Sequence, residues 1–204
     1  GFDGVDFRGY RGELDIYRLP EFTTGAGETA RRFRVAGIEI PCFSSSVRLM
    51  PRQGEDPQAG ISEIKAYAML CRRFEASFIR IFGGAIGDTP RPEAVKIAAA
   101  KLRELVKAAD GYGVQLLVET HDDWLDCHHL AAVLAAAGTP SAGIVWDTHH
   151  PYRMRGESPA ETCAVLGERI RYTHWKDSRP QPHSQRGYQL CLVGAGDLPM
   201  REML

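Results

Sequence analysis

The chain has 204 residues, of which 44% are hydrophobic and 25% are charged, a composition typical of a folded globular protein and not of a disordered one. The 25 Lys and Arg residues against 26 Asp and Glu residues give a net charge of −1 without a basic excess, so we expect no nucleic-acid partner. The longest apolar run, residues 130–137, is far shorter than the ~20 residues of a membrane span, so we expect no membrane partner.

The five cysteines are scattered along the chain and contain no Cys-x-x-Cys pair. This spacing favours neither a disulfide framework nor a zinc finger. Reduced thiols are the simplest interpretation, and they predict a cytoplasmic protein. The length suits one hydrophobic core, so we expect residues 1–204 to form a single domain.

Short apolar runs alternate with amphipathic segments along the chain. Strands are predicted over residues 4–8, 37–43, 77–82, 114–119, 143–147 and 170–175, and helices over residues 60–74, 92–109, 126–137 and 158–167, with an earlier helix ending over residues 29–35. The helix over residues 92–109 is the clearest, because Val95, Leu102 and Val106 lie on one apolar stripe. The remaining segment, 177–197, is rich in turn residues, and we expect only a short strand pair near residues 188–193.

Strands that alternate with helices predict right-handed βαβ units and a parallel sheet. Two architectures contain such units, the open doubly wound sheet and the (β/α)8 TIM barrel. No Gly-x-Gly-x-x-Gly motif follows any predicted strand, which weakens the open-sheet alternative. Since eight units typically need about 250 residues, the units of this chain predict an incomplete (β/α)8 barrel, a fragment that lacks the first and last strands.

Three consecutive predicted strands end in residues that can bind a metal ion. These residues are Glu119, Asp147 and His174, spaced 28 and then 27 residues apart. Because the carboxyl ends of neighbouring parallel strands meet at one edge, we expect the three side chains to converge. Each of them alone is more often an ion-paired or hydrogen-bonded strand end, so their joint placement carries the hypothesis. Carboxylates with an imidazole and no thiolate suit Mn²⁺, Mg²⁺, Co²⁺, Zn²⁺ or Fe²⁺.

Several short motifs follow one another in the second half of the chain. They are Val-Gln-Leu-Leu-Val-Glu-Thr-His at 114–121, the pair Asp147 and His150, Gly-Glu-Ser-Pro at 156–159, Tyr-Thr-His-Trp-Lys-Asp at 172–177 and Gly-Ala-Gly-Asp-Leu-Pro at 194–199. In their order and spacing the chain resembles the sugar phosphate isomerase/epimerase family with the xylose isomerase-like barrel. The resemblance implies that Glu119, Asp147 and His174 bind a divalent ion, together with a Glu on a last strand that this sequence does not include.

The resemblance also implies a metal-dependent isomerase or epimerase that converts a small sugar, a sugar phosphate or a hydroxy-keto compound through a metal-stabilised enediolate. Glu119 would transfer the proton, and His150 would act with it by contacting a substrate hydroxyl. Lys176 would neutralise developing charge, and Arg153 would hold a substrate phosphate or carboxylate. Proton and hydride transfer both remain open. Barrels of this group often form homodimers, which is the assembly we expect.

Other assignments remain open at this stage. His149 is the alternative to His150 if the strand end bulges, and His121 is a candidate for a supporting role. A dehydratase of an inosose or a dehydroshikimate-like acid would use the same barrel and the same intermediate. An apurinic-site endonuclease shares the fold, but it needs a three-zinc cluster and a basic surface that the sequence does not provide. A catalytically silent binding barrel is favoured by the missing fourth ligand.

Overall fold

A computed structural model describes residues 1–52 and 54–204 and contains a five-stranded parallel sheet. Its strands are β1 (Cys42–Arg48), β2 (Phe78–Phe82), β3 (Gln115–Glu119), β4 (Ala142–Asp147) and β5 (Ile170–His174). Each strand pairs with the next one in chain order, as in a (β/α)8 barrel. A doubly wound sheet would reverse its order at a switch point, so that alternative is excluded. The prediction of an incomplete (β/α)8 barrel is confirmed.

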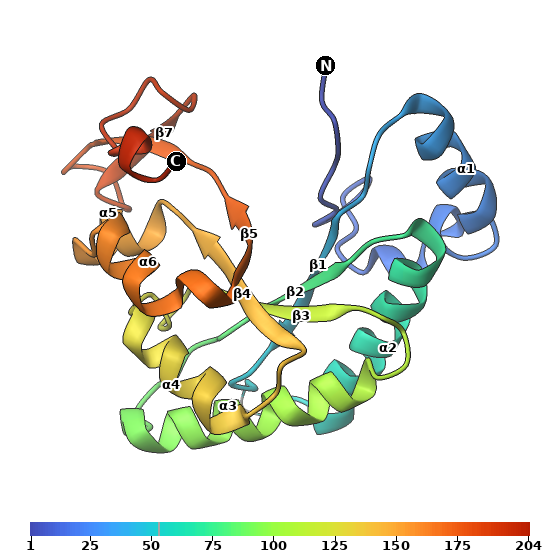
Figure 1. Cartoon of the computed structure of the whole chain (residues 1–204), viewed down its shortest axis with the longest axis horizontal. Coiled ribbons are helices and arrows are strands. Elements are labelled where there is room, and N and C mark those ends of the chain that lie inside the picture. The colour runs from blue at the N-terminus through green and yellow to red at the C-terminus, as the bar shows by residue number, and fades with distance from the viewer. Residues whose placement is uncertain (53) are drawn as a thin grey trace.

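Helices connect these strands and cover the outer face of the sheet (Figure 1). They are α1 (Ala26–Ala36), α2 (Pro57–Phe74), α3 (Arg91–Ala108), α4 (Cys127–Ala137), α5 (His150–Arg155) and α6 (Pro159–Leu166), with 3₁₀ turns at Ile16–Arg18, Pro20–Phe22, Gly167–Arg169 and Met200–Glu202. The predicted helices agree with these bounds to within a few residues. None of the helices described is long and apolar enough to cross a membrane.

The helix starts follow the capping chemistry of the sequence. Asp56, Asp126 and Ser158 each accept a hydrogen bond from a backbone N–H in the first turn of α2, α4 and α6. A proline follows Asp56 and another follows Ser158, at helix positions where a missing N–H costs nothing. These caps fix where each helix leaves the loop that precedes it.

The N-terminal segment lies beside β1 but forms only isolated bridges to it. Gly4 bridges to Glu39 and Phe7 bridges to Phe43, both in parallel, whereas the sequence predicts a continuous strand over residues 4–8. Pro41 lies between the two bridges and has no N–H to donate, which interrupts the ladder. The segment still occupies the place of a strand next to β1.

The second predicted strand is misplaced by several residues. The sequence predicts residues 37–43, but β1 spans Cys42–Arg48. Its centre is a run of serines that resembles a loop, yet Ser44 and Ser45 are buried, and Ser45 Oγ donates to the carbonyl oxygen of Arg80 at 2.8 Å. Hydrogen bonds within the barrel take the place of an apolar pattern here, so hydrophobicity alone does not mark this strand.

The hydrophobic core lies between the sheet and its helices. Buried apolar residues of the strands meet those of the helices there; they include Ile79 and Ile81 of β2, Leu116 and Val118 of β3, Ile144 of β4, Ile64 of α2, Leu102 of α3 and Leu130 of α4. Because side chains alternate along a strand, the residues between these point toward the other face. Arg80, Glu119 and Asp147 occupy such positions, so the alternation that builds the core also places polar groups inside the barrel.

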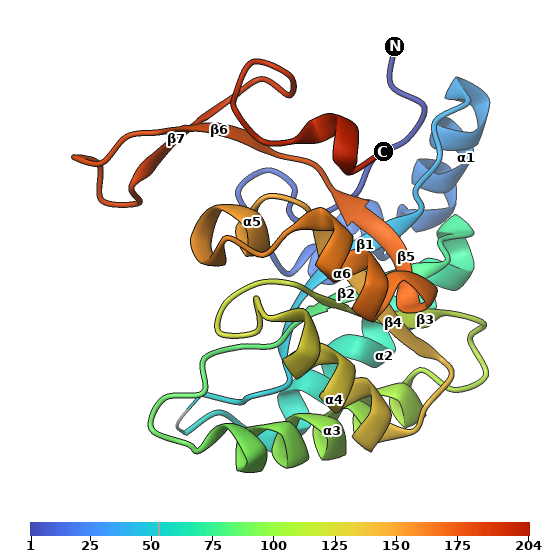
Figure 2. The ribbon, with the colours of Figure 1, turned by 60° about the vertical axis from the view of Figure 1, so that its left-hand side comes forward.

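After β5 the chain forms an antiparallel hairpin of β6 (Asp177–Pro180) and β7 (Tyr188–Cys191). Figure 2 shows this hairpin extending away from the parallel sheet. One strand of the predicted pair, Tyr188–Cys191, lies where the sequence predicts it, whereas its partner strand, Asp177–Pro180, lies earlier in the chain than predicted.

Candidate metal centre

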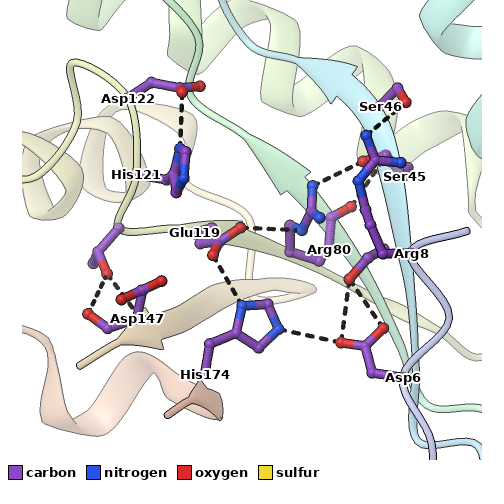
Figure 3. A network of polar contacts seen from close by, with 12 residues as sticks. Asp6, Arg8, Ser45, Ser46, Arg80, Glu119, His121, Asp122, Asp147 and His174 are labelled. Carbon is purple, nitrogen blue, oxygen red and sulfur yellow. Dashed lines mark hydrogen bonds and ion pairs between the residues drawn. The ribbon is translucent and has the colours of Figure 1, made fainter. Parts of the chain in front are cut away.

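Glu119, Asp147 and His174 are the last residues of β3, β4 and β5. The strands are parallel and neighbouring, and Asp147 pairs directly with His174 in register. One ligand atom of each side chain lies within 4.8 Å of the ligand atoms of the other two. The structure therefore brings together the three residues that the sequence proposes as ligands (Figure 3).

Glu119 is held by two positively charged neighbours. Its Oε1 atom lies 2.9 Å from His174 Nδ1, and its Oε2 atom lies 3.1 Å from Arg80 Nε. Arg80 is buried as well, and its Nη1 atom donates to the carbonyl oxygen of Ser45 at 2.8 Å. Burial raises the pKa of Glu119, but His174 and Arg80 lower it by more, so the pKa lies below its usual value.

His174 bridges two carboxylates. Its Nδ1 atom faces Glu119, and its Nε2 atom lies 3.1 Å from Asp6 Oδ2 in the N-terminal segment. Burial lowers the pKa of His174, but the hydrogen bonds to Asp6 and Glu119 raise it by more, to about 9. Without an ion, the imidazole carries a proton on each ring nitrogen at neutral pH.

Asp147 is fixed by the turn that follows β4. Its Oδ1 atom accepts hydrogen bonds from the backbone N–H groups of His149 and His150, both at 3.0 Å. Its Oδ2 atom lies 3.2 Å from His150 Nδ1 and forms an ion pair with Lys176. Burial raises the pKa of Asp147, but His150 and Lys176 lower it by more. The pKa therefore lies well below its usual value, and this carboxylate is ionised at neutral pH.

The residues at this edge fit a divalent cation. Two buried carboxylates and an imidazole converge, which is the donor set expected for Mg²⁺, Mn²⁺, Co²⁺ or Zn²⁺. Their negative charge is balanced by Arg80, Lys176 and the proton on His174. Asp147, His149 and His150 form an overlapping group that shares the Asp147 carboxylate.

Two residues of this network escape the sequence analysis. Asp6 lies on the N-terminal segment, bonds to His174 and accepts a hydrogen bond from Ser44 Oγ at 3.0 Å. Arg80 lies in the middle of β2 and pairs with Glu119. Each is a charged residue between apolar neighbours in a predicted strand, which is the signal that could have identified both.

The residues proposed to contact substrate lie in different environments. Lys176 pairs with Asp147, and the His150 ring packs against the His121 ring with 4.5 Å between centroids. The contacts of Arg153 are with other residues: its Nε atom donates to Ser178 Oγ at 3.0 Å, and its guanidinium pairs with Asp197. The short α5 helix directs this side chain toward the C-terminal segment, where it links α5 to Ser178 and Asp197.

A cavity of about 490 Å³ opens beside the three candidate ligands. The charged and aromatic residues around it come from the N-terminal segment, from the strands and from the segment after β5; they are Asp6, Arg8, Arg80, Phe82, Glu119, His121, His174, Trp175 and Lys176. Both acidic and basic groups line it, so a small polar molecule with hydroxyl and carbonyl groups would find partners of either kind.

A family model described as xylose isomerase-like TIM barrel matches residues 1–204. The chain belongs to this family. The match extends over the barrel strands and the three candidate ligands together. Members of such a family share the barrel, and the reaction of each depends on the residues at the carboxyl ends of its strands. No curated protein matches this chain significantly in sequence.

Solved structures show the same fold at low sequence identity. A probable 3-DHS dehydratase, AsbF, from Bacillus anthracis has a TM-score of 0.80 at 17% identity, over 100% of this chain and 77% of its own. The IOLI protein with a bound zinc atom has a TM-score of 0.80 at 17% identity, over 99% and 73%. A 3-keto-D-glucoside 4-epimerase from E. coli has a TM-score of 0.73 at 9% identity, over 100% and 86%. At these identities the likeness concerns the fold.

Proposed function

We propose that this chain carries the site of a metal-dependent isomerase or epimerase that acts on a small sugar, a sugar phosphate or a hydroxy-keto compound. The observation that carries the proposal is the convergence of Glu119, Asp147 and His174 within 4.8 Å at the carboxyl edge of the sheet. The family and the solved barrels named as an epimerase and as a zinc-bound protein support the same interpretation.

Glu119 is the residue that we assign to proton transfer. A divalent ion bound here would supply a Lewis acid for the substrate carbonyl. The pKa of Glu119 lies below its usual value, so the carboxylate is ionised at neutral pH and can accept a proton from the carbon next to that carbonyl. Arg80 holds the Oε2 atom, which fixes the orientation of the carboxylate toward the cavity.

Two further side chains are assigned to the substrate. Lys176 lines the cavity, and its ammonium group can neutralise negative charge that develops on a substrate oxygen. His150 is 16% exposed and lies against His121, which itself lines the cavity, so its imidazole can reach a substrate hydroxyl. Arg153 is left out of the proposed substrate contacts because Ser178 and Asp197 hold its guanidinium.

A dehydratase is the second candidate. The probable dehydratase AsbF shares the fold over the whole of this chain with a TM-score of 0.80. Abstraction of a proton next to a carbonyl is common to both reactions, and only a leaving group on the neighbouring carbon separates them. Mass detection distinguishes the two, because a dehydratase product is lighter by one water and an isomerase product is not.

The proposal is tested by measuring the turnover of ketoses, aldoses, sugar phosphates and keto acids by the wild-type protein and by the Glu119→Gln variant. We expect the wild-type protein, loaded with Mn²⁺ or Zn²⁺, to convert at least one of them and the variant to lose turnover by at least about 100-fold, within the range of general acid–base catalysis. The matched control is Glu168→Gln, an exposed Glu just before β5, at the opposite edge of the sheet. Retained turnover in Glu119→Gln would show that the assigned role is wrong.

A further inference from the structure

Two guanidinium groups converge on one residue at the carboxyl end of β1. Arg8 Nη2 donates to Ser46 Oγ at 3.2 Å, and Arg48 Nη1 donates to the carbonyl oxygen of Ser46 at 3.1 Å. Seven other arginines pair with carboxylates, whereas within residues 1–52 and 54–204 neither Arg8 nor Arg48 has a carboxylate within ion-pair distance. Two like charges thus lie close together without a direct counterion.

Arg8 also has an unused donor. Its Nη1 atom is buried and finds no hydrogen-bond partner among the described residues. A buried donor without a partner is unfavourable, so such a group normally finds a protein atom, an ordered water or a ligand to accept its hydrogen bond. Figure 3 shows the Arg8 guanidinium next to Ser45 and Ser46 of β1, with its hydrogen bond to Ser46 drawn.

Arg8 lines the cavity that two of the candidate ligands also line, and Arg48 lies next to that cavity. Arg8 lines it directly, together with Glu119 and His174. Arg48 lies with its guanidinium carbon 6.0 Å from the centroid of the Phe82 ring, and Phe82 lines the same cavity. A molecule in this cavity can therefore meet Glu119, His174 and the Arg8 guanidinium, and Arg48 reaches the same region through its contacts with Ser46 and Phe82.

The nearby acids are committed to other donors. Glu63 accepts a hydrogen bond from the backbone N–H of Ser46 at 2.6 Å. Burial raises the pKa of Glu63, although the hydrogen bond from Ser46 and the charges of Arg8 and Arg48 oppose this shift, so the two arginines act on Glu63 only at a distance. Asp6 is bonded to His174 and to Ser44. Neither acid neutralises Arg8 or Arg48 through a direct contact, which leaves room for an external anion.

We propose that Arg8 and Arg48 bind the anionic group of the substrate, a carboxylate or a phosphate. A guanidinium presents a planar fork of N–H donors that matches such oxyanions, and two of them around one anion give a specific site. The inference rests on the proposed function, which places the reacting carbonyl of the substrate at the candidate metal ligands. It narrows the substrate to a hydroxy-keto compound that carries an oxyanion group, and it disfavours an uncharged sugar.

The test uses two simple probes, inorganic phosphate and glycolate, titrated calorimetrically into the protein at low ionic strength. We expect one of them to bind the wild-type protein, and Arg8→Gln and Arg48→Gln each to weaken that binding by about tenfold or more. The probe that binds more tightly identifies a phosphate or a carboxylate as the preferred group. The matched control is Arg72→Gln, an exposed arginine near the end of α2, which should bind as the wild type does.

Failure of the inference differs from failure of the proposed function. Glu119→Gln should bind the anion at least as tightly as the wild type, because it leaves Arg8 and Arg48 in place and removes a negative charge from the cavity. Arg8→Lys keeps the positive charge without the fork, so we expect binding between that of the wild type and that of Arg8→Gln. Binding of neither probe to the wild type, or equal affinity in Arg8→Gln, Arg48→Gln and the wild type, would overturn the anion site, whatever the enzyme assays show.

Discussion

At the scale of single residues, Arg80 and Glu119 form a buried ion pair, each with a side chain only 4% exposed. The Arg80 guanidinium also lies 3.8 Å from the centroid of the Phe82 ring. Removing one partner of a buried pair leaves an uncompensated charge in a medium of low dielectric constant. We expect Arg80→Met to lower the free energy of unfolding by about 3–5 kcal/mol, measured by urea denaturation.

Arg31 provides the matched control for that prediction, since it pairs with Glu28 on an exposed helix surface. Arg31→Met should change the stability little, because water screens exposed charges. The double variant Arg80→Met, Glu119→Met should recover part of the loss, since it removes both charges. If Arg80→Met and Arg31→Met had the same effect, the buried pair would not be important for folding.

At the scale of elements, Gly83 determines how the loops after β2 and β3 pack together. A Cβ atom on Gly83 would lie 2.1 Å from Cδ1 of Trp124, which is fully buried. We therefore expect Gly83→Ala to destabilise the protein by about 1–3 kcal/mol through overpacking, and to change the near-ultraviolet circular dichroism of the tryptophans.

Gly167→Ala is the control for Gly83→Ala. Gly167 has helical dihedral angles of −47° and −48°, and nothing lies within 4 Å of a Cβ atom placed there. Alanine should be neutral or slightly stabilising at this position. A Gly83→Ala protein as stable as Gly167→Ala would mean that the Trp124 loop can move away at little cost.

Asp177 organises the segment around the β6–β7 hairpin. The residue is 1% exposed, and its carboxylate accepts hydrogen bonds from the backbone N–H groups of Ser178, Gly194 and Gly196, at 2.8, 2.9 and 2.7 Å. Burial raises the pKa of Asp177, and the bonds from Gly196, Ser178 and Gly194 lower it by more, to below its usual value. The ionised carboxylate therefore stabilises the folded segment.

The pH dependence follows from that direction of the shift. A carboxyl whose pKa is lowered by folding contributes stability above its unfolded pKa of about 3.9, and this stability is lost as the pH falls through the folded value. We expect Asp177→Asn to be less stable than the wild type at pH 5, with a difference that narrows toward pH 2 in urea denaturation. Asp3→Asn, at an exposed position, should show no such narrowing. A difference that stayed constant with pH would contradict the assigned role.

At the scale of the whole molecule, the sequence predicts what depends on order along the chain. Parallel strands meet at one edge, so the strand-end residues Glu119, Asp147 and His174 could be placed together before the fold was known. Asp6 and Arg80 could not, because their partners are set by barrel closure and by side-chain orientation. The strand β1 is misplaced in the prediction for a related reason, since its serines form their hydrogen bonds with distant segments.

The candidate metal centre joins three consecutive strands, so an ion would stabilise the barrel as a unit. The ligand atoms converge only when β3, β4 and β5 are paired in register, a condition that the unfolded chain does not meet. An ion that binds only the folded state adds about 2.7 kcal/mol to the stability when its free concentration is 100 times its Kd. We expect Mn²⁺ to raise the Tm of the wild-type protein and to leave the Tm of Asp147→Asn unchanged.

Asp126→Asn is the matched control for the effect of Mn²⁺. Asp126 belongs to a second group with Cys127 and Glu157, away from the ends of the strands. It also caps α4, and asparagine caps a helix about as well as aspartate, so its variant should keep this cap and still show the full rise when Mn²⁺ is added. If the rise persisted in Asp147→Asn and disappeared in Asp126→Asn, the ion would bind at the start of α4, and the strand-end residues would have to be explained as a network of ion pairs alone.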